Sequence, residues 1–151
     1  MGKLVDREII MDEYNLDRFI KEQQQTNSDA YAELSRGRKR SHWMWWIFPQ
    51  IVGLGMTSTS YYYSIKSLGE AKAFLAHPYL GKNIREISNV LLGMDTNDAG
   101  GVMGYPDDLK LRSSMTLFAE AAPEEEVFQK VLDEYYDGKK DQRTIAILND
   151  L

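Results

Sequence analysis

The chain has 151 residues, of which 43% are hydrophobic and 27% charged, and it carries a net charge of −5. This composition excludes global disorder, and the length fits a single domain over residues 1–151. The acidic balance makes nucleic acid an unexpected partner, because non-specific nucleic-acid binding needs a broad basic surface. The absence of cysteine excludes disulfides, thiolate nucleophiles and cysteine-based metal sites.

No segment has the character of a targeting or membrane-spanning sequence. Residues 1–14 are mixed and charged, without the apolar core of a signal peptide, and we expect them to form a loosely ordered N-terminal extension. The longest apolar run, residues 43–48, is too short to span a bilayer. We therefore expect a cytoplasmic protein that has no membrane partner.

Capping residues divide the next part of the chain into two predicted helices. Asn15 is expected to cap a helix that runs to about Gln25. Ser28 is expected to open a second helix. Gly37 suits its end, where a left-handed backbone is needed.

Residues 41–50, SHWMWWIFPQ, hold all three tryptophans and one of the two histidines. Both helical and strand spacing leave apolar side chains on every side, which indicates burial all round. We favour a short helix that Pro49 stops, because the residue before a proline avoids the helical conformation. Two interpretations stay open: the segment is the centre of the core, or it is one wall of a ligand pocket with His42 and Gln50 at its ends.

The loop of residues 53–60 is built of small and hydroxylated residues. Ser67 and Glu70 then have the spacing of a capping box for the next helix. Pro78 starts a further helix at its first helical position. Four residues of that helix share one apolar face: Leu80, Ile84, Ile87 and Leu91.

Residues 94–104 are rich in glycine, aspartate and asparagine and are predicted as a loop. Pro106 opens a helix, and Pro123, followed by three glutamates, opens another that ends at Gly138. Asp141 caps the last helix. The chain is therefore predicted to be all-α, a compact single-domain bundle of seven or eight short helices around the tryptophan-rich segment.

Three polar residues fall inside the buried arc of the helix that begins at Pro106. At about 100° per residue, Asp107, Lys110 and Ser114 lie between two apolar groups. Burying an unpaired charge is costly, so these side chains must pair with each other, pair with another element or face a cavity. A structural network and a pocket both remain open as interpretations.

The remaining candidates each have a structural alternative. His42 is either a general base or a histidine at the edge of the core, and it lies too far along the chain from His77 to form a metal signature. The 53–60 loop either holds an anion with its amides and hydroxyls or is a capped turn. The basic run of residues 36–40 is either a solvated helix end or a patch for phosphate or a partner.

Three motifs together resemble a known family: residues 41–50, residues 77–81 (HPYLG) and residues 106–118 (PDDLKLRSSMTLF). The chain resembles domain-of-unknown-function family 1810, small and mostly bacterial proteins, over about residues 16–148. The resemblance implies a compact, mainly helical domain, and it implies no catalytic residues or cofactor. Members are sometimes labelled calpastatin, which the composition argues against because calpastatin-type inhibitors are disordered.

We expect a pocket between the tryptophan-rich segment, the 53–60 loop and the helix that begins at Pro106. The candidate catalytic residues are His42, Asp107, Lys110 and Ser114. The candidate ligand-binding residues are Trp45, Gln50, Ser58 and Tyr63. Aromatic rings would stack on a planar group, cations and amides would hold an anion, and His42 or Asp107 would move a proton.

This pocket suggests a binder or hydrolase of a small anionic ligand that is nucleotide-derived or phosphorylated. The alternative is a non-catalytic interaction module in which the same polar residues form a purely structural network. The sequence indicates neither a cofactor nor an oligomeric state.

Overall fold

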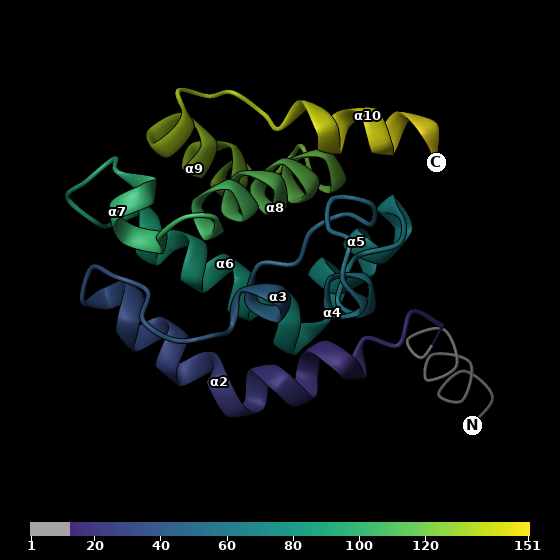
Figure 1. Cartoon of the computed structure of the whole chain (residues 1–151), viewed down its shortest axis with the longest axis horizontal. Helices are drawn as coiled ribbons and strands as arrows, with labels where there is room; N and C mark the ends of the chain where they lie inside the picture. Colours follow the sequence, from purple (N-terminus) through teal and green to yellow (C-terminus); the bar gives the residue numbers. More distant parts are fainter. Residues whose placement is uncertain (1–12) are drawn as a thin grey trace.

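The computed structural model describes residues 13–151, which form nine helices (Figure 1). They are α2 (Asp17–Ser35), α3 (Met44–Ile47), α4 (Ser58–Tyr62), α5 (Leu68–Ala76), α6 (Pro78–Leu92), α7 (Ala99–Met103), α8 (Asp107–Ala121), α9 (Glu126–Tyr136) and α10 (Gln142–Asp150). Within this part of the chain there is no strand, only a single bridge between Ile51 and Ile65. The predicted all-α class is confirmed. The extension predicted over residues 1–14 lies outside the described residues except for its last two.

Helices α6 and α8 lie at the centre of the molecule. Helix α6 packs against α2, α5 and α9, and α8 packs against α5, α7, α9 and α10. Figure 1 shows α2 along one side and α10 along the opposite side, with α6 and α8 between them. The predicted apolar face of α6 is at most 1% exposed in each of its four residues: Leu80, Ile84, Ile87 and Leu91.

Helix α2 is one continuous helix, so the predicted break before Ser28 is wrong. Ser28 is exposed in the middle of the helix, and the nearby Thr26 hydroxyl donates to the carbonyl of Glu22 as it would in any helix interior. The expected cap, Asn15, has a φ of 51°, and Leu16 takes the N-cap position instead. Buried residues before and after the polar stretch keep the helix intact, because tertiary burial overrides local propensity.

The tryptophan-rich segment forms the predicted short helix, α3, which ends just before Phe48 and Pro49. Trp43 is buried, but Trp45 and Trp46 are half-buried, so the prediction of burial on every side is wrong for these two. A helix of four residues at the edge of the core can place only one of its sides against that core. Its other side faces the loop of residues 50–64.

Residues 94–104, predicted as a loop, contain helix α7. The carboxylate of Asp98 accepts a hydrogen bond from the amide of Gly101 at 3.0 Å and so caps the helix. Ala99, Val102 and Met103 are buried. Two adjacent glycines hid this helix from sequence analysis, because glycine is a poor helix former.

The predicted capping box at Ser67 is only half formed. The Ser67 hydroxyl accepts from the amide of Glu70 at 3.0 Å. The Glu70 carboxylate, however, accepts from the amide of Lys66 and from Arg18 instead of closing the box. Glu70 therefore ties α5 to α2.

Candidate functional site

A loop closed on itself brings Gln50 and Tyr63 to the tryptophan-rich segment. The amide of Ile65 donates to the carbonyl of Gln50 at 2.8 Å, and the amide of Val52 donates to the carbonyl of Ile65 at 2.9 Å. Both ends of the loop are thus fixed beside α3.

The same loop is shaped further by a capping box between Thr57 and Ser60 at the start of α4. A Cβ added at Gly55 would lie 2.6 Å from the Cβ of Ser60, so the loop passes this hydroxyl too closely for any larger residue.

A groove of about 290 Å³ lies between this loop and helices α8 and α10. Its lining residues are Trp45, Gln50, Leu54, Gly55, Pro106, Leu109, Lys110, Arg112, Ser113, Asp141 and Arg143. Three of them are cations and one is a carboxylate, although the chain as a whole is acidic. We call this hollow the cationic groove.

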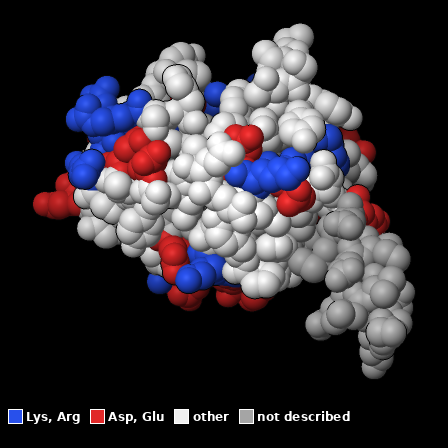
Figure 2. Space-filling view, turned by 90° about the horizontal axis from the view of Figure 1, so that it is seen from below, with Lys and Arg blue, Asp and Glu red and all other residues white. Residues whose placement is uncertain are grey.

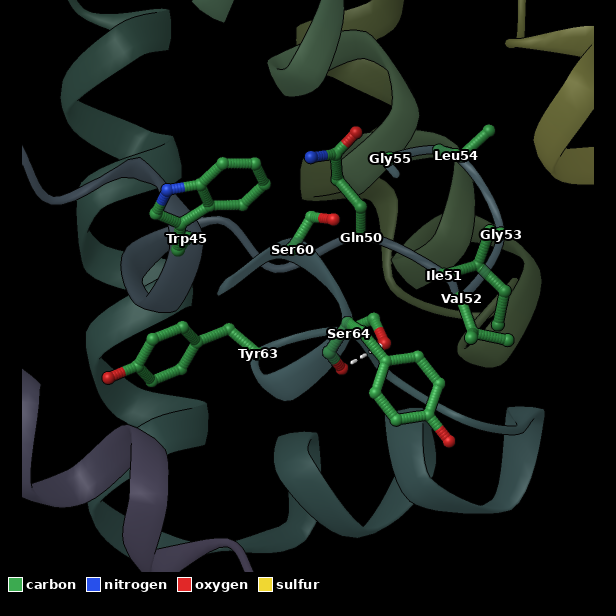
Figure 3. Close-up of a pocket in the computed structure, with 11 residues that line it drawn as sticks. Trp45, Gln50, Ile51, Val52, Gly53, Leu54, Gly55, Ser60, Tyr63 and Ser64 are labelled. Carbon is green, nitrogen blue, oxygen red and sulfur yellow. Dashed lines mark hydrogen bonds between the residues drawn. The ribbon is translucent and has the colours of Figure 1, made fainter. Parts of the chain in front are cut away.

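A smaller cavity of about 110 Å³ adjoins the groove, and the two share Trp45, Gln50, Leu54 and Gly55. Figure 3 shows Trp45 and Gln50 on one side of it and Tyr63 on another. Its other lining residues are Ile51, Val52, Gly53, Ser60, Tyr61 and Ser64. None of the described residues that line it is charged. We call it the neutral cavity.

Lys110 links the cationic groove to a cluster of charges. Its ammonium nitrogen lies 4.0 Å from the centroid of the Trp45 ring and 3.4 Å from a carboxylate oxygen of Asp107. The other oxygen of Asp107 lies 2.9 Å from the ammonium nitrogen of Lys39, whose side chain is only 8% exposed. Two cations share one carboxylate, so the cluster keeps a net positive charge, and Lys110 presents it to the groove.

The α8–α10 side of the groove is held together by Arg112 and Asp141. The Arg112 guanidinium donates to the carbonyls of Lys139 and Lys140 at 2.8 and 3.0 Å. One oxygen of Asp141 accepts from the amide of Thr144, which caps α10, and from the hydroxyl of Ser113 on α8. These contacts position α10 against α8.

Arg143 is the exposed cation of this wall. It makes no hydrogen bond or ion pair with any residue of 13–151. Lys110 and Arg143 are therefore the two cations whose charge is directed to the groove and not to a carbonyl of the chain.

A family model described as "Protein of unknown function (DUF1810)" matches residues 13–148. The chain belongs to the DUF1810 family. It is similar to the crystal structure, at 1.38 Å resolution, of the conserved hypothetical protein Rv1873 from Mycobacterium tuberculosis. The two are 42% identical, with a TM-score of 0.89, and the match covers 91% of this chain and 99% of that chain. No match is found among curated proteins.

Two of the three DUF1810 motifs seen in the sequence meet at the cationic groove. Residues 41–50 supply Trp45 and Gln50, and residues 106–118 supply Lys110 together with its neighbours on α8. The third motif, residues 77–81, lies at the junction of α5 and α6. The family match confirms the resemblance predicted from the three motifs. Two of these motifs lie together at the cationic groove.

Four of the eight candidate residues lie around the adjoining hollows. Trp45, Gln50 and Lys110 line the cationic groove, and Tyr63 lines the neutral cavity with Trp45 and Gln50. Burial raises the pKa of Tyr63, with further increases from Glu22 and Tyr62. Tyr63 is therefore a neutral hydroxyl at physiological pH.

The other four candidates are placed elsewhere. His42 is exposed, and Ser58 is exposed at the start of α4, where it lines a separate hollow. Asp107 lies beside Lys110, and its two carboxylate oxygens form ion pairs with Lys39 and Lys110. Ser114 is fully buried, and its hydroxyl has no hydrogen-bond partner among the described residues.

Four polar or charged groove residues were not among the predicted candidates: Arg112, Ser113, Asp141 and Arg143. Asp141 was recognised as a helix cap, but nothing local to it indicates that its carboxylate also reaches Ser113, 28 residues away. The sequence did offer one signal for this site. Arg112 and Arg143 each lie on a helix that also has an apolar face, α8 and α10.

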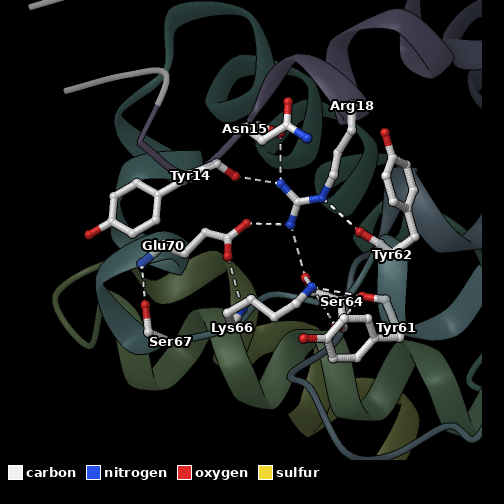
Figure 4. A network of polar contacts seen from close by, with 9 residues as sticks. All are labelled: Tyr14, Asn15, Arg18, Tyr61, Tyr62, Ser64, Lys66, Ser67 and Glu70. Atoms are coloured by element: carbon white, nitrogen blue, oxygen red, sulfur yellow. Dashed lines mark hydrogen bonds and ion pairs between the residues drawn. The ribbon is translucent and has the colours of Figure 1, made fainter. Parts of the chain in front are cut away.

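A second polar cluster surrounds the buried guanidinium of Arg18 (Figure 4). Its five N–H groups donate to four backbone carbonyls and to the Glu70 carboxylate. The ammonium group of the nearby Lys66 likewise donates to two carbonyls and to the hydroxyl of Ser64. Burial lowers the pKa of Lys66, and Arg18 lowers it further. All these donors are satisfied internally, so this cluster is structural.

Within residues 13–151, no group of three or more histidines, aspartates or glutamates is placed to hold a metal ion. Likewise, none of the helices described is long and apolar enough to cross a membrane.

Proposed function

We propose that this DUF1810 protein binds a small anionic molecule, of the phosphorylated or nucleotide-like kind, in the cationic groove. The observation that carries this proposal is the gathering of Lys110, Arg112 and Arg143 around one hollow that contains a single carboxylate. Like charges held close together are unfavourable unless a counter-charge joins them. That carboxylate, on Asp141, is already engaged as the cap of α10.

The charges on the face shown in Figure 2 are arranged differently. Basic and acidic side chains lie close to one another there, and uncharged surface separates their groups. In the cationic groove, by contrast, three cations face a single carboxylate, which favours a small anion.

Trp45 and Gln50 would recognise the uncharged part of the ligand. Lys110 covers one face of the Trp45 ring, and the half-buried indole offers its remaining aromatic surface to a planar group. The Gln50 carboxamide makes no hydrogen bond with any described residue, so both its donor and its acceptor are available to a ligand.

The placement of the catalytic candidates supports binding more than hydrolysis. A hydrolytic site needs a nucleophile or water, a base and an anion-stabilising group within reach of one another. His42 is exposed, Ser114 is buried within α8, and Asp107 is held by Lys39. The Asp107–Lys39 pair favours the structural interpretation of the α8 polar residues, and Lys110 favours the pocket interpretation.

Calorimetric titration of the full chain with inorganic phosphate, ribose 5-phosphate and nucleoside monophosphates tests this function. We expect at least one of these probes to bind and the binding to weaken with added salt. Arg143→Gln and Lys110→Gln should each weaken it about tenfold or more, because a hydrogen bond to a charged group contributes about 1.5–3 kcal/mol.

Lys130→Gln is the matched control for Arg143→Gln, since it also removes an exposed cation, from α9, where Lys130 pairs with Glu126. Equal affinities for the control and the two groove variants, or no binding of any probe, would contradict the proposal.

A further inference from the structure

We infer that the ligand carries a single six-membered ring, which enters the neutral cavity while its phosphate remains in the cationic groove. This inference rests on the proposed function and names the class of ligand: a phosphorylated compound with one uncharged planar ring, such as a pyrimidine nucleotide.

The separation of charge between the two hollows gives the ligand its direction. Every charged residue that lines either hollow lies in the groove, on α8 or at the start of α10. The cavity is lined by aromatic, aliphatic and uncharged polar side chains alone among the described residues. Trp45 and Gln50 line both hollows, so the two lie side by side, and we place one molecule across both.

The size of the neutral cavity limits the ring. Its volume is about 110 Å³, whereas an apolar cavity of about 150 Å³ accommodates a benzene molecule. Nothing larger than a single six-membered ring can therefore enter, and we place such a ring in the cavity with its exocyclic bond directed to the groove. A fused two-ring purine does not fit unless the loop of residues 50–64 moves.

Gln50 is the residue that we expect to form hydrogen bonds with the edge of the ring. The Ser60 hydroxyl is engaged in the capping box with Thr57, and the Ser64 hydroxyl donates to the carbonyl of Tyr61. The Gln50 carboxamide has no such partner among the described residues. It offers one acceptor and two donors, which match the hydrogen-bonding groups along the edge of a pyrimidine.

The experiment is a set of calorimetric titrations of the full chain. The single-ring probes are UMP, CMP and dTMP, the two-ring probes are AMP and GMP, and the probe without a base is ribose 5-phosphate. We expect at least one single-ring probe to bind ten times or more tightly than both two-ring probes and the probe without a base. The tightest of the three identifies which ring is preferred.

Gln50→Ala should lower the affinity for the preferred single-ring probe about tenfold, and by much more than it lowers the affinity for ribose 5-phosphate. Gln25→Ala, an exposed glutamine of α2, is the matched control. A melting temperature within the range of the control shows that Gln50→Ala is folded.

Three results would overturn the inference. If ribose 5-phosphate binds as tightly as the nucleotides and Gln50→Ala has no effect, the ring assignment is wrong and the cationic groove stands. If AMP or GMP binds as tightly as the single-ring probes, the size limit is wrong. If no probe binds at all, both this inference and the proposed function are wrong.

Discussion

At the scale of single residues, Glu33 organises the segment that leads into α3. Its carboxylate accepts hydrogen bonds from the amides of Arg40 and Ser41 at 2.6 and 2.9 Å, from the Trp43 indole at 3.0 Å and from the Ser41 hydroxyl. Burial raises the pKa of Glu33, but these hydrogen bonds outweigh it and hold the pKa at about 2. One ionised side chain thus fixes the approach to the candidate site.

The lowered pKa of Glu33 gives a prediction on acid stability. Its folded pKa lies below the ordinary value of 4.5, so the stabilisation is complete above that value and is lost as the pH falls toward about 2. We expect Glu33→Gln to lower the free energy of unfolding by about 1 kcal/mol at pH 7. Urea unfolding at pH 7 and pH 3 should show a smaller difference between variant and wild type at pH 3.

Glu86→Gln, on the exposed side of α6, is the control for this measurement, because its contact with Lys82 is long and solvated. A loss that is the same at both pH values would show that the Glu33 charge is not responsible.

Ser114 gives a second prediction at this scale. Its buried hydroxyl lacks a partner among the described residues, and leaving a polar group unsatisfied costs about 1–3 kcal/mol. Ser114→Ala should therefore leave stability unchanged or raise it by up to about 1 kcal/mol, as measured by urea unfolding. It should also leave ligand affinity unchanged. A loss of affinity would show that Ser114 contributes to ligand binding.

At the scale of elements, Gly81 explains the HPYLG motif. Helices α5 and α6 meet at His77, whose ring nitrogen accepts from the amides of Tyr79 and Leu80 at the start of α6. A Cβ at Gly81 would lie only 2.1 Å from the backbone oxygen of Leu75, in the preceding helix. Backbone atoms at a helix junction cannot move aside as a flexible side chain can.

We therefore expect Gly81→Ala to lower the free energy of unfolding by about 3 kcal/mol or more, at the upper end of overpacking effects. Gly93→Ala, just past the other end of α6, is the matched control, because its Cβ would meet only carbonyl oxygens at 3.6 Å. Urea unfolding of the two variants decides this prediction. Similar stabilities would show that α5 and α6 separate easily.

Helix ends whose signals are local could be predicted from the sequence. Pro78, Gly37 and Asp141 begin or end helices by their own backbone or side-chain chemistry, and all three were predicted from it. The wrong predictions concern segments whose conformation depends on burial in the tertiary structure. Ser28 has the composition of a cap yet lies within α2, and the glycine-rich residues 99–103 form α7 because three of their side chains reach the core.

At the scale of the whole molecule, the place of the pocket was predictable but its chemistry was not. The tryptophan-rich segment, the 53–60 loop and α8 do surround the two hollows. The side formed by α10 depends on contacts of Arg112 and Ser113 with residues about one fifth of the chain away. No local pattern encodes such contacts, so two of the three groove cations were missed.

This arrangement places the wall of the groove on a weakly attached helix. Helices α6 and α8 each pack against several others, whereas α10 packs chiefly against α8, and Thr144 is its only buried residue. Local opening requires least free energy where few apolar contacts are lost. In hydrogen exchange of the free protein, we therefore expect the amides of α10 to exchange first and those of α6 and α8 last.

A ligand that bridges α8 and α10 should change that order. Lys110 and Arg143 stand on the two helices, so an anion held by both must be released before α10 can detach, and binding adds to the free energy of opening. Saturating ligand should slow exchange in α10 about tenfold or more and leave α2 unchanged. Arg143→Gln should abolish this slowing while α6 and α8 keep their protection. Exchange in α10 that is already as slow as in α6 without ligand would show that α10 is an integral part of the core.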